Sequence, residues 1–253
     1  MKNLEEMLSV LGASADSISL SPTTIKRLKE QGIEIPKPER LTPEQIVNEL
    51  FSQERKERAL QMYTRIPDLP DIPVASIQSL YTEIRAAIIL GLHGAAITLC
   101  GILIEYVLKY SAYKIEMGGF VKYDAETWDE FEELDFAKAI GRANKNRLLT
   151  KEARKSLNDF RVRFRNPYNH YNIRKITANY YHEDLTILNT KTNEVEVRSV
   201  AAKDDPVLQA IVKPVADADS VLEVYVYADS IVRYLWTKIR DLPNALLSDE
   251  TEA

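Results

Sequence analysis

Two side chains in the second half of the chain are of types that could act together on a phosphodiester. They are Arg165 and His170, the first and last residues of the stretch Arg165-Asn166-Pro167-Tyr168-Asn169-His170. Arginine stays charged and can hold two phosphate oxygens through parallel hydrogen bonds. Histidine has the side-chain pKa nearest neutrality, so it can take a proton from a hydroxyl or give one to a leaving oxygen. RNA supplies a 2′-hydroxyl nucleophile for such a pair, whereas DNA does not.

Pro167 decides how these two side chains are presented. On an unbroken helix, residues five positions apart lie about 140° apart and face different surroundings. A proline ring clashes with the carbonyl four residues earlier and disfavours a helical residue before it. We therefore predict that a helix starting at about Thr150 ends or kinks at Asn166. Asn166 then caps a new helix, and Arg165 and His170 can aim at one point. The alternative is a capped kink whose histidine only packs or bonds a carbonyl.

Basic residues are concentrated around this stretch. From Arg142 to Lys175 there are eleven Lys or Arg and only two acids, Glu152 and Asp159, a local net charge of +9 in a chain of net charge −5. Such a concentration suits a phosphate-bearing ligand, although a solvated basic helix face is a common alternative. The candidate RNA contacts are the basic and aromatic side chains beside the motif: Arg161, Arg163, Tyr171, Arg174 and Lys175.

The sequence lacks the motifs of several other common types of catalytic or binding site. The three histidines and one cysteine are scattered, and no pair has a recognised metal-ligand spacing, so we predict no metal and no cofactor. The sequence contains no phosphate-binding glycine loop of the GxxxxGK[ST] or GxGxxG type and no G-x-S-x-G serine signature.

Cys100 has no partner for an internal disulfide, which favours a reducing, cytoplasmic location, and the acidic N-terminal residues are unlike an export signal.

The elements that must position the motif are helices. Residues 76–112 are strongly apolar, and the run from Ala86 to Ile104 is long enough to cross a membrane. Gly91-Leu92-His93-Gly94 offers a helix stop and restart, and the run has no basic flank, so two buried helices are favoured over a membrane span. A stripe of apolar residues at helical spacing, from Val221 to Ile239, predicts a long closing helix.

We predict a mainly α fold with four parts. Residues 1–66 form a helical extension, in which Thr42 and Gln45 signal the start of a helix that runs to about Arg65. The prolines of 67–75 favour an extended linker. A helical domain of 76–242 carries a small β-hairpin near 185–198, where two alternating segments flank a polar turn, and 243–253 form an acidic tail.

Arginine, asparagine, three residues and histidine in this context resemble the signature of HEPN domains, helical bundles that include many prokaryotic ribonucleases of phage defence and toxin–antitoxin systems. The apolar helix pair of residues 80–110, with its glycine turn and Glu105, is also similar to the first helix pair of a HEPN-like group. The resemblance covers roughly residues 76–181. It implies a HEPN-like bundle and a homodimer whose two motifs face each other across one cleft.

The resemblance also implies roles for individual residues. Arg165 and His170 match the catalytic pair, and Asn166 matches the polar position that often follows the arginine. Glu105 resembles the acid that approaches the pair in some members, with a surface or capping acid as the alternative. The expected activity is metal-independent endoribonuclease cleavage of RNA, in phage defence or a toxin-like system.

Two other functions remain open on the sequence. A noncatalytic HEPN module could use the same basic surface to hold RNA or a nucleotide. A protein-interaction subunit could use residues 1–66 to dock on a regulatory or antitoxin partner, with the bundle as a scaffold. The presence of both Arg165 and His170 favours the enzyme, because binding alone does not need an imidazole.

Overall fold

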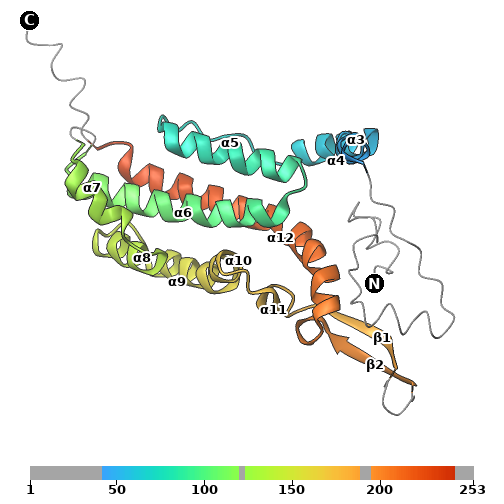
Figure 1. Ribbon diagram of the computed structural model, residues 1–253. Helices are drawn as coiled ribbons and strands as arrows, with labels where there is room; N and C mark the ends of the chain where they lie inside the picture. Colours follow the sequence, from blue (N-terminus) through green and yellow to red (C-terminus); the bar gives the residue numbers. More distant parts are fainter. Residues whose placement is uncertain (1–41, 120–122, 189–194, 243–253) are drawn as a thin grey trace, which may run out of the picture. The chain divides into compact units, whose positions relative to one another are not determined.

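The computed structural model describes residues 42–119, 123–188 and 195–242 (Figure 1). The chain divides into two compact units, Met1–Gln61 and Met62–Ala253. Residues 1–41 and the predicted acidic tail, 243–253, lie outside the described residues. The prediction of a mainly α fold with a small hairpin is confirmed, since helices make up most of the described chain and its only sheet has two strands.

The described part of the first unit begins with a helix at the predicted start. Helix α3 (Pro43–Leu50) is capped by Thr42, whose hydroxyl accepts from the Gln45 N–H while the Gln45 side chain accepts from the Thr42 N–H. The expected single helix to Arg65 is wrong. The chain turns at Phe51 and a separate helix, α4 (Gln53–Tyr63), follows with Ser52 accepting from the Arg55 N–H. A serine competes well for backbone donors at a helix start, which explains the restart.

The second unit is a helical bundle around α6. Helices α5 (Ala75–Ile89), α6 (His93–Glu116) and α12 (Pro206–Ile239) run side by side, and α8 (Phe136–Lys145) and α9 (Lys151–Phe160) lie along the bundle (Figure 1). The short helix α7 (Ala125–Glu132) precedes α8 and buries Trp128 and Phe131. The helical apolar spacing noted in the sequence therefore marks the core faces of α5, α6 and α12.

The predicted division of the long apolar run is confirmed. Helix α5 ends at Ile89, Gly91 adopts a positive φ of 77° that suits glycine, and α6 begins at His93. Helix α6 is the one helix of the described chain that is long and apolar enough to cross a membrane, and 56% of its most apolar window is buried inside the bundle. Both the core helix of a soluble protein and a membrane helix can have this length and composition.

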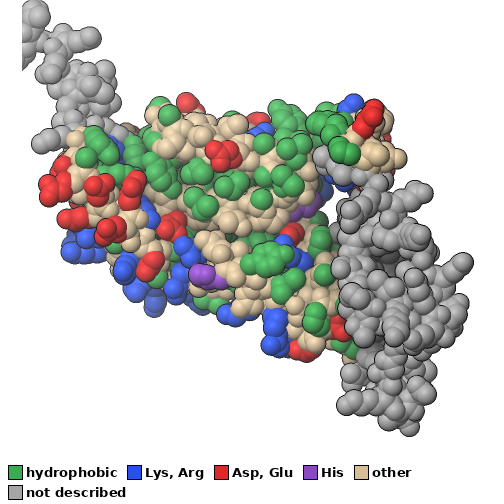
Figure 2. Space-filling view, viewed as in Figure 1, with side chains coloured by type: hydrophobic (Ala, Val, Ile, Leu, Met, Phe, Trp, Pro, Cys, Tyr) green, Lys and Arg blue, Asp and Glu red, His purple; other side chains and the backbone are tan. Residues whose placement is uncertain are grey.

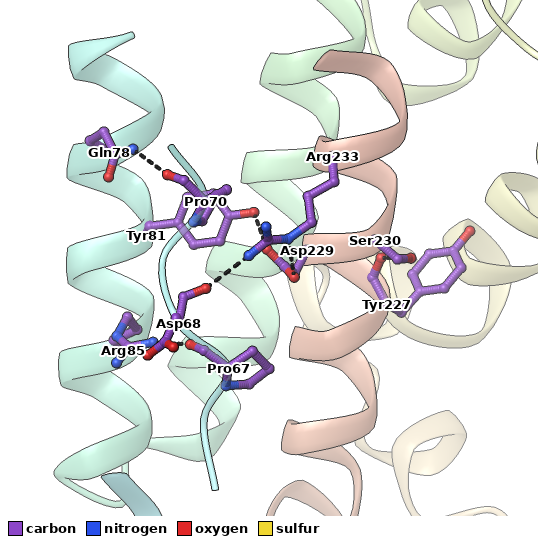
Figure 3. Close-up of polar contacts among 10 residues, drawn as sticks. All are labelled: Pro67, Asp68, Pro70, Gln78, Tyr81, Arg85, Tyr227, Asp229, Ser230 and Arg233. Atoms are coloured by element: carbon purple, nitrogen blue, oxygen red, sulfur yellow. Dashed lines mark hydrogen bonds and ion pairs between the residues drawn. The ribbon is translucent and has the colours of Figure 1, made fainter. Parts of the chain in front are cut away.

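The segment from Pro67 to Val74 is not helical, as its prolines predict, and hydrogen bonds hold it on α5 and α12 (Figure 3). Gln78 of α5 donates to the carbonyls of Pro70 and Ile72, and Arg85 donates to the carbonyl of Pro67. Ile72 is buried in the core. The segment is therefore packed along its length as part of the second unit.

A buried polar contact joins α5 to α12 beside this segment (Figure 3). The Tyr81 hydroxyl donates to Asp229 Oδ1 at 2.8 Å, and Arg233 donates to Asp229 Oδ2 at 2.8 Å and to the Asp68 carbonyl. Burial, followed by the nearby Asp229 charge, raises the pKa of Tyr81, so its hydroxyl stays protonated and available to donate. Each oxygen of the Asp229 carboxylate therefore accepts a hydrogen bond.

This contact gives a stability prediction. The substitution Tyr81→Phe leaves Asp229 Oδ1 buried without its donor, and we expect the free energy of unfolding to fall by about 1–2 kcal/mol. Tyr123→Phe, which removes a hydroxyl from an exposed side chain, is the matched control and should change it by less than about 0.5 kcal/mol. Urea denaturation measures both values. Equal effects in the two variants would show that the Tyr81–Asp229 bond does not stabilise the bundle.

The predicted hairpin is present and longer than expected. Strands β1 (Tyr181–Leu188) and β2 (Val195–Ala201) are antiparallel, with Leu185 opposite Arg198 and Leu188 opposite Val195. Helix α12 also begins earlier than its apolar stripe suggested, because Asp205 caps it at Pro206 and it continues through an internal proline, Pro214.

Candidate active site

The motif lies on a helix that widens and does not break. Helix α9 starts after the predicted Thr150 cap, continues as a π-helical turn, η2 (Arg161–Arg165), and passes directly into α10 (Asn166–Asn169). The prediction that Pro167 forces Asn166 out of the helical region is wrong, because Asn166 has φ −68° and ψ −46°. The Asn166 N–H donates five residues back, to Arg161. The wider turn makes room for the proline ring beside the Arg163 carbonyl.

The uninterrupted helix separates the two candidate catalytic side chains. Arg165 turns inward, and its side chain is 18% exposed. His170 ends α10 and is exposed, and within the described chain its imidazole has no hydrogen bond. His170 does not line the pocket that Arg165 and Asn169 line, and in an ideal α-helix residues five positions apart lie about 140° apart. Asn169, one turn after Arg165, lies on the same side of the helix as the arginine.

Glu105 of α6 holds Arg165. One Glu105 oxygen, Oε2, accepts from the arginine Nη2 at 2.9 Å, and the other, Oε1, pairs with Lys109 Nζ at 3.0 Å. Lys109 also donates to the Glu132 carbonyl at 3.0 Å. Both carboxylate oxygens are therefore engaged with cations, and the carboxylate carries one negative charge between two positive ones.

A hollow of about 380 Å³ opens beside this cluster. Its walls come from α6, α7 and the motif helix. The arginine in its wall donates to Glu105 through Nη2, which leaves other N–H donors of the guanidinium unused, whereas its Nε is buried without a hydrogen-bond partner. A guanidinium with a free donor beside a hollow can bind an additional oxygen ligand. The lining residues are Ile102, Glu105, Tyr106, Lys109, Trp128, Glu132, Arg165 and Asn169.

The close fit of α6 against the motif helix depends on Gly101. A Cβ at this buried position would lie 3.3 Å from the Arg165 Cγ. The Arg165 guanidinium also lies 5.8 Å from the centre of the Phe136 ring, a cation–π contact from α8. Arg165 is thus placed by α6 on one side and by α8 on the other.

The two helical glycines Gly101 and Gly141 give a matched test of this fit. A Cβ on Gly141 in α8 would point into open space, so Gly141→Ala should raise the free energy of unfolding by up to about 1 kcal/mol through helix propensity. Gly101→Ala gains the same propensity but presses on Arg165, so we expect it to be less stable than Gly141→Ala by about 1 kcal/mol. Urea denaturation compares the two. An equal gain in the free energy of unfolding in both variants would show that the Arg165 side chain moves away from the added methyl group without a loss of stability.

The other predicted RNA contacts lie on the outside of the same region. Arg163, Tyr171, Arg174 and Lys175 are exposed, whereas Arg161 is partly buried. Asn166, predicted as part of the catalytic motif, is also partly buried. Arg174 donates to the Lys203 carbonyl and pairs with Asp204 at 3.3 Å. Figure 2 shows Lys and Arg side chains gathered along the α8 and α9 side of the bundle, next to the acidic side chains around α7.

Sequence reasoning missed the residues that complete the hollow. Lys109 follows Glu105 by one helical turn, and Asn169 follows Arg165 by one turn, so an i, i+4 search from each predicted residue would have found them. Trp128 and Glu132 come from α7 and have no such sequence signal, because only the packing of α7 on α6 brings them to the hollow.

Within residues 42–119, 123–188 and 195–242, no group of three or more His, Cys, Asp or Glu side chains could hold a metal ion. Comparison of the chain with protein-family models, with curated proteins and with solved structures finds no match.

Proposed function

We propose that this protein is a metal-independent endoribonuclease of the HEPN type, with Arg165 and His170 as its catalytic residues. The observation that carries the proposal is the arrangement of Arg165, held by Glu105 at 2.9 Å at the edge of an open hollow, with His170 exposed on the next turn. An arginine held in place by a carboxylate is prepared to receive a phosphate, and an exposed imidazole is available for proton transfer.

Each residue has a distinct task in this mechanism. His170 removes the proton of the ribose 2′-hydroxyl or protonates the leaving 5′-oxygen. Arg165 neutralises the charge that builds on phosphorus, through guanidinium N–H donors that Glu105 does not use. Both oxygens of Glu105 are bound to cations, so we assign it to positioning Arg165 and not to proton transfer.

The separation of Arg165 and His170 supports a site shared between two copies of the chain. Within one chain His170 does not line the hollow beside Arg165, as expected from the separation of about 140° between positions five apart on an ideal α-helix, so one copy is not expected to surround a phosphate with both side chains. A symmetric homodimer repeats every contact twice, and Arg165 of one copy can face His170 of the other in two equivalent places. The proposal therefore includes a homodimer.

The experiment that tests the activity uses purified full-length protein with total RNA and with tRNA. The wild-type protein should cut RNA, whereas the double variant Arg165→Ala, His170→Ala should leave it intact at the same concentration. Equal cleavage by both proteins would show that the activity belongs to another site or to a contaminant. A role in phage defence or in a toxin-like system follows if expression of the active protein, and not of the double variant, stops cell growth.

A noncatalytic RNA-binding module is the second candidate. It is favoured by one observation, the exposed His170 with no hydrogen bond in the described chain and no place in the hollow beside Arg165. Binding and cleavage are separated by one measurement, in which a labelled RNA is incubated with the protein and then run on native and denaturing gels. A shifted but uncut RNA would establish binding alone.

A further inference from the structure

A second hollow lies on the other side of the motif helix. It has a volume of about 420 Å³ and is bounded by the start of α6, by Tyr168 and Tyr171, and by α12 around Pro214. The motif segment separates the two hollows, because Arg165 and Asn169 line the first while Tyr168 and Tyr171 line the second. The second hollow has no part in the cleavage proposed above.

A lysine and a carboxylate are fixed in its wall. Lys213 Nζ lies 2.6 Å from Asp217 Oδ2, and the Tyr168 hydroxyl donates to Asp217 Oδ1 at 2.8 Å. Burial, followed by the Asp217 charge, raises the pKa of Tyr168, so this hydroxyl stays protonated. Both Asp217 oxygens are therefore occupied and its charge is balanced. Lys213 has three donors and uses one of them on Asp217.

Two aromatic rings adjoin this lysine. Its ammonium lies 5.6 Å from the centre of the Tyr168 ring and 5.3 Å from that of the Tyr171 ring. Tyr168 is buried, whereas Tyr171 is 67% exposed and leaves much of its ring open to a ligand. The hollow thus places an ammonium group next to an open aromatic surface.

The position of Tyr171 costs the chain conformational energy. Its φ of 47° lies in the left-handed region, which bulky side chains rarely adopt. Glycine or asparagine would suit this backbone better. An exposed tyrosine gains little free energy from packing, and here its backbone is strained. A ligand that contacts the ring would explain why a tyrosine occupies this position.

Two further residues of the wall, His93 and Gly94, lie at the start of α6. Burial lowers the pKa of His93, against the opposing effect of Asp217, so its imidazole is neutral at pH 7 and can donate or accept. A Cβ on Gly94 would lie 2.6 Å from Asp217 Oδ2 and 3.0 Å from Lys213 Nζ, so a side chain there would displace the ion pair. A larger residue at position 94 would therefore require the Lys213 and Asp217 side chains to move.

We propose that this second hollow binds a nucleoside phosphate, with the base stacked on the open face of Tyr171 and the phosphate bound by Lys213. Aromatic faces stack on any nucleobase, and an ammonium binds phosphate oxygens through charge-assisted hydrogen bonds. The nucleotide can be free or can belong to an RNA chain. The inference does not depend on cleavage by Arg165 and His170, since it concerns different side chains.

Calorimetric titration of the full-length protein tests the proposal with defined probes. The probes are the four ribonucleoside monophosphates, the four nucleosides, inorganic phosphate and a trinucleotide RNA with 2′-O-methyl sugars, which resists 2′-hydroxyl cleavage. We expect at least one monophosphate or the trinucleotide to bind saturably. Its nucleoside and inorganic phosphate alone should each bind at least about tenfold more weakly, because each has only one of the two groups.

Variants locate the binding in this hollow. Tyr171→Gly should weaken binding at least about tenfold while leaving the melting temperature unchanged or higher, because glycine relieves the positive φ. Lys213→Gln should weaken binding to a similar extent while its amide still donates to Asp217. Tyr181→Ala, which removes a tyrosine with 65% exposure outside the hollow, is the matched control and should bind normally.

The outcomes are distinct. Binding of the monophosphate identifies a free nucleotide as the ligand, whereas binding of the trinucleotide alone identifies an RNA chain. Failure of every probe to bind, or equal binding by wild type, Tyr171→Gly and Lys213→Gln, would overturn the proposal. Because the readout is binding, an inactive protein that still binds the nucleotide would reject the proposed cleavage and keep this inference.

Discussion

His170→Ala is expected to reduce RNA cleavage at least about a hundredfold, because removal of a general acid or base costs a factor of about 10²–10⁴. The side chain is exposed and makes no hydrogen bond within the described chain, so the free energy of unfolding should change by less than about 0.5 kcal/mol. Gel assays of a labelled RNA measure the rate, and urea denaturation measures the stability. Cleavage at the wild-type rate would remove His170 from the mechanism.

Arg165→Ala should lose cleavage to a similar extent, but with a cost in stability. The arginine packs against Gly101 and Phe136 and pairs with Glu105, so its removal leaves that carboxylate with Lys109 alone. We expect the free energy of unfolding to fall by about 1–2 kcal/mol. Arg240→Ala, at the exposed end of α12, is the control and should retain both activity and stability.

A mixture of the two inactive variants tests whether the site is shared. If Arg165 of one copy works with His170 of the other, a heterodimer of the two variants contains one intact site and one doubly inactive site. Equal coexpression makes about half of the dimers mixed, so about a quarter of wild-type activity should return. If each chain contains its own complete site, no activity returns. Light scattering that shows an active monomer would also contradict the shared site.

A 2′-deoxy substitution at the mapped cleavage position should abolish cutting there, and EDTA should leave the cutting of normal RNA unchanged. The region from Arg142 to Lys175 carries eleven basic and two acidic residues, so a phosphate bound there already meets excess positive charge. Without a metal-activated water, the nearest nucleophile is the 2′-hydroxyl deprotonated by His170. Attack by that oxygen forms its bond to phosphorus as the bond to the 5′-oxygen breaks. The products are a 2′,3′-cyclic phosphate and a 5′-hydroxyl.

The control for this experiment is an RNA with the 2′-deoxy sugar one position away from the mapped site, which should be cut normally. Mass spectrometry of the products identifies their ends. A 5′-phosphate product, cutting at the deoxy position, or loss of activity in EDTA would each contradict the mechanism. A nuclease that failed in this way would still use Arg165 if the Arg165→Ala variant were inactive.

Local sequence signals were sufficient for most of the secondary structure. The Thr42 and Thr150 caps, the Gly91 turn and the alternating segments around the hairpin each act through the residue's own backbone preference or its near neighbours. Such effects are readable from spacing because they involve atoms only a few residues apart. The amphipathic pattern of α12 is of the same kind, since burial of one face requires only the helical period.

The sequence indicated some residues of the candidate site but not its geometry. Arg165 and Glu105 are 60 positions apart, and only the packing of α6 on the motif helix, made possible by Gly101, brings them to 2.9 Å. The sequence rule for Pro167 led to the wrong geometry, because a proline can be accommodated by a helix break or by a wider turn. Both solutions satisfy the local constraint, so the surrounding packing decides between them.

What the sequence by itself determined is therefore the helical class, the hairpin, the basic region and the identity of the arginine and histidine that we propose as the catalytic pair. The tertiary structure decided the direction in which each side chain points. It turned Arg165 inward onto Glu105, left His170 exposed, and brought Lys213, Asp217 and Tyr171 from two distant segments to one hollow. The physical reason is that residue type and local preference act over a few positions, whereas side-chain contacts depend on which helix faces fill the core together.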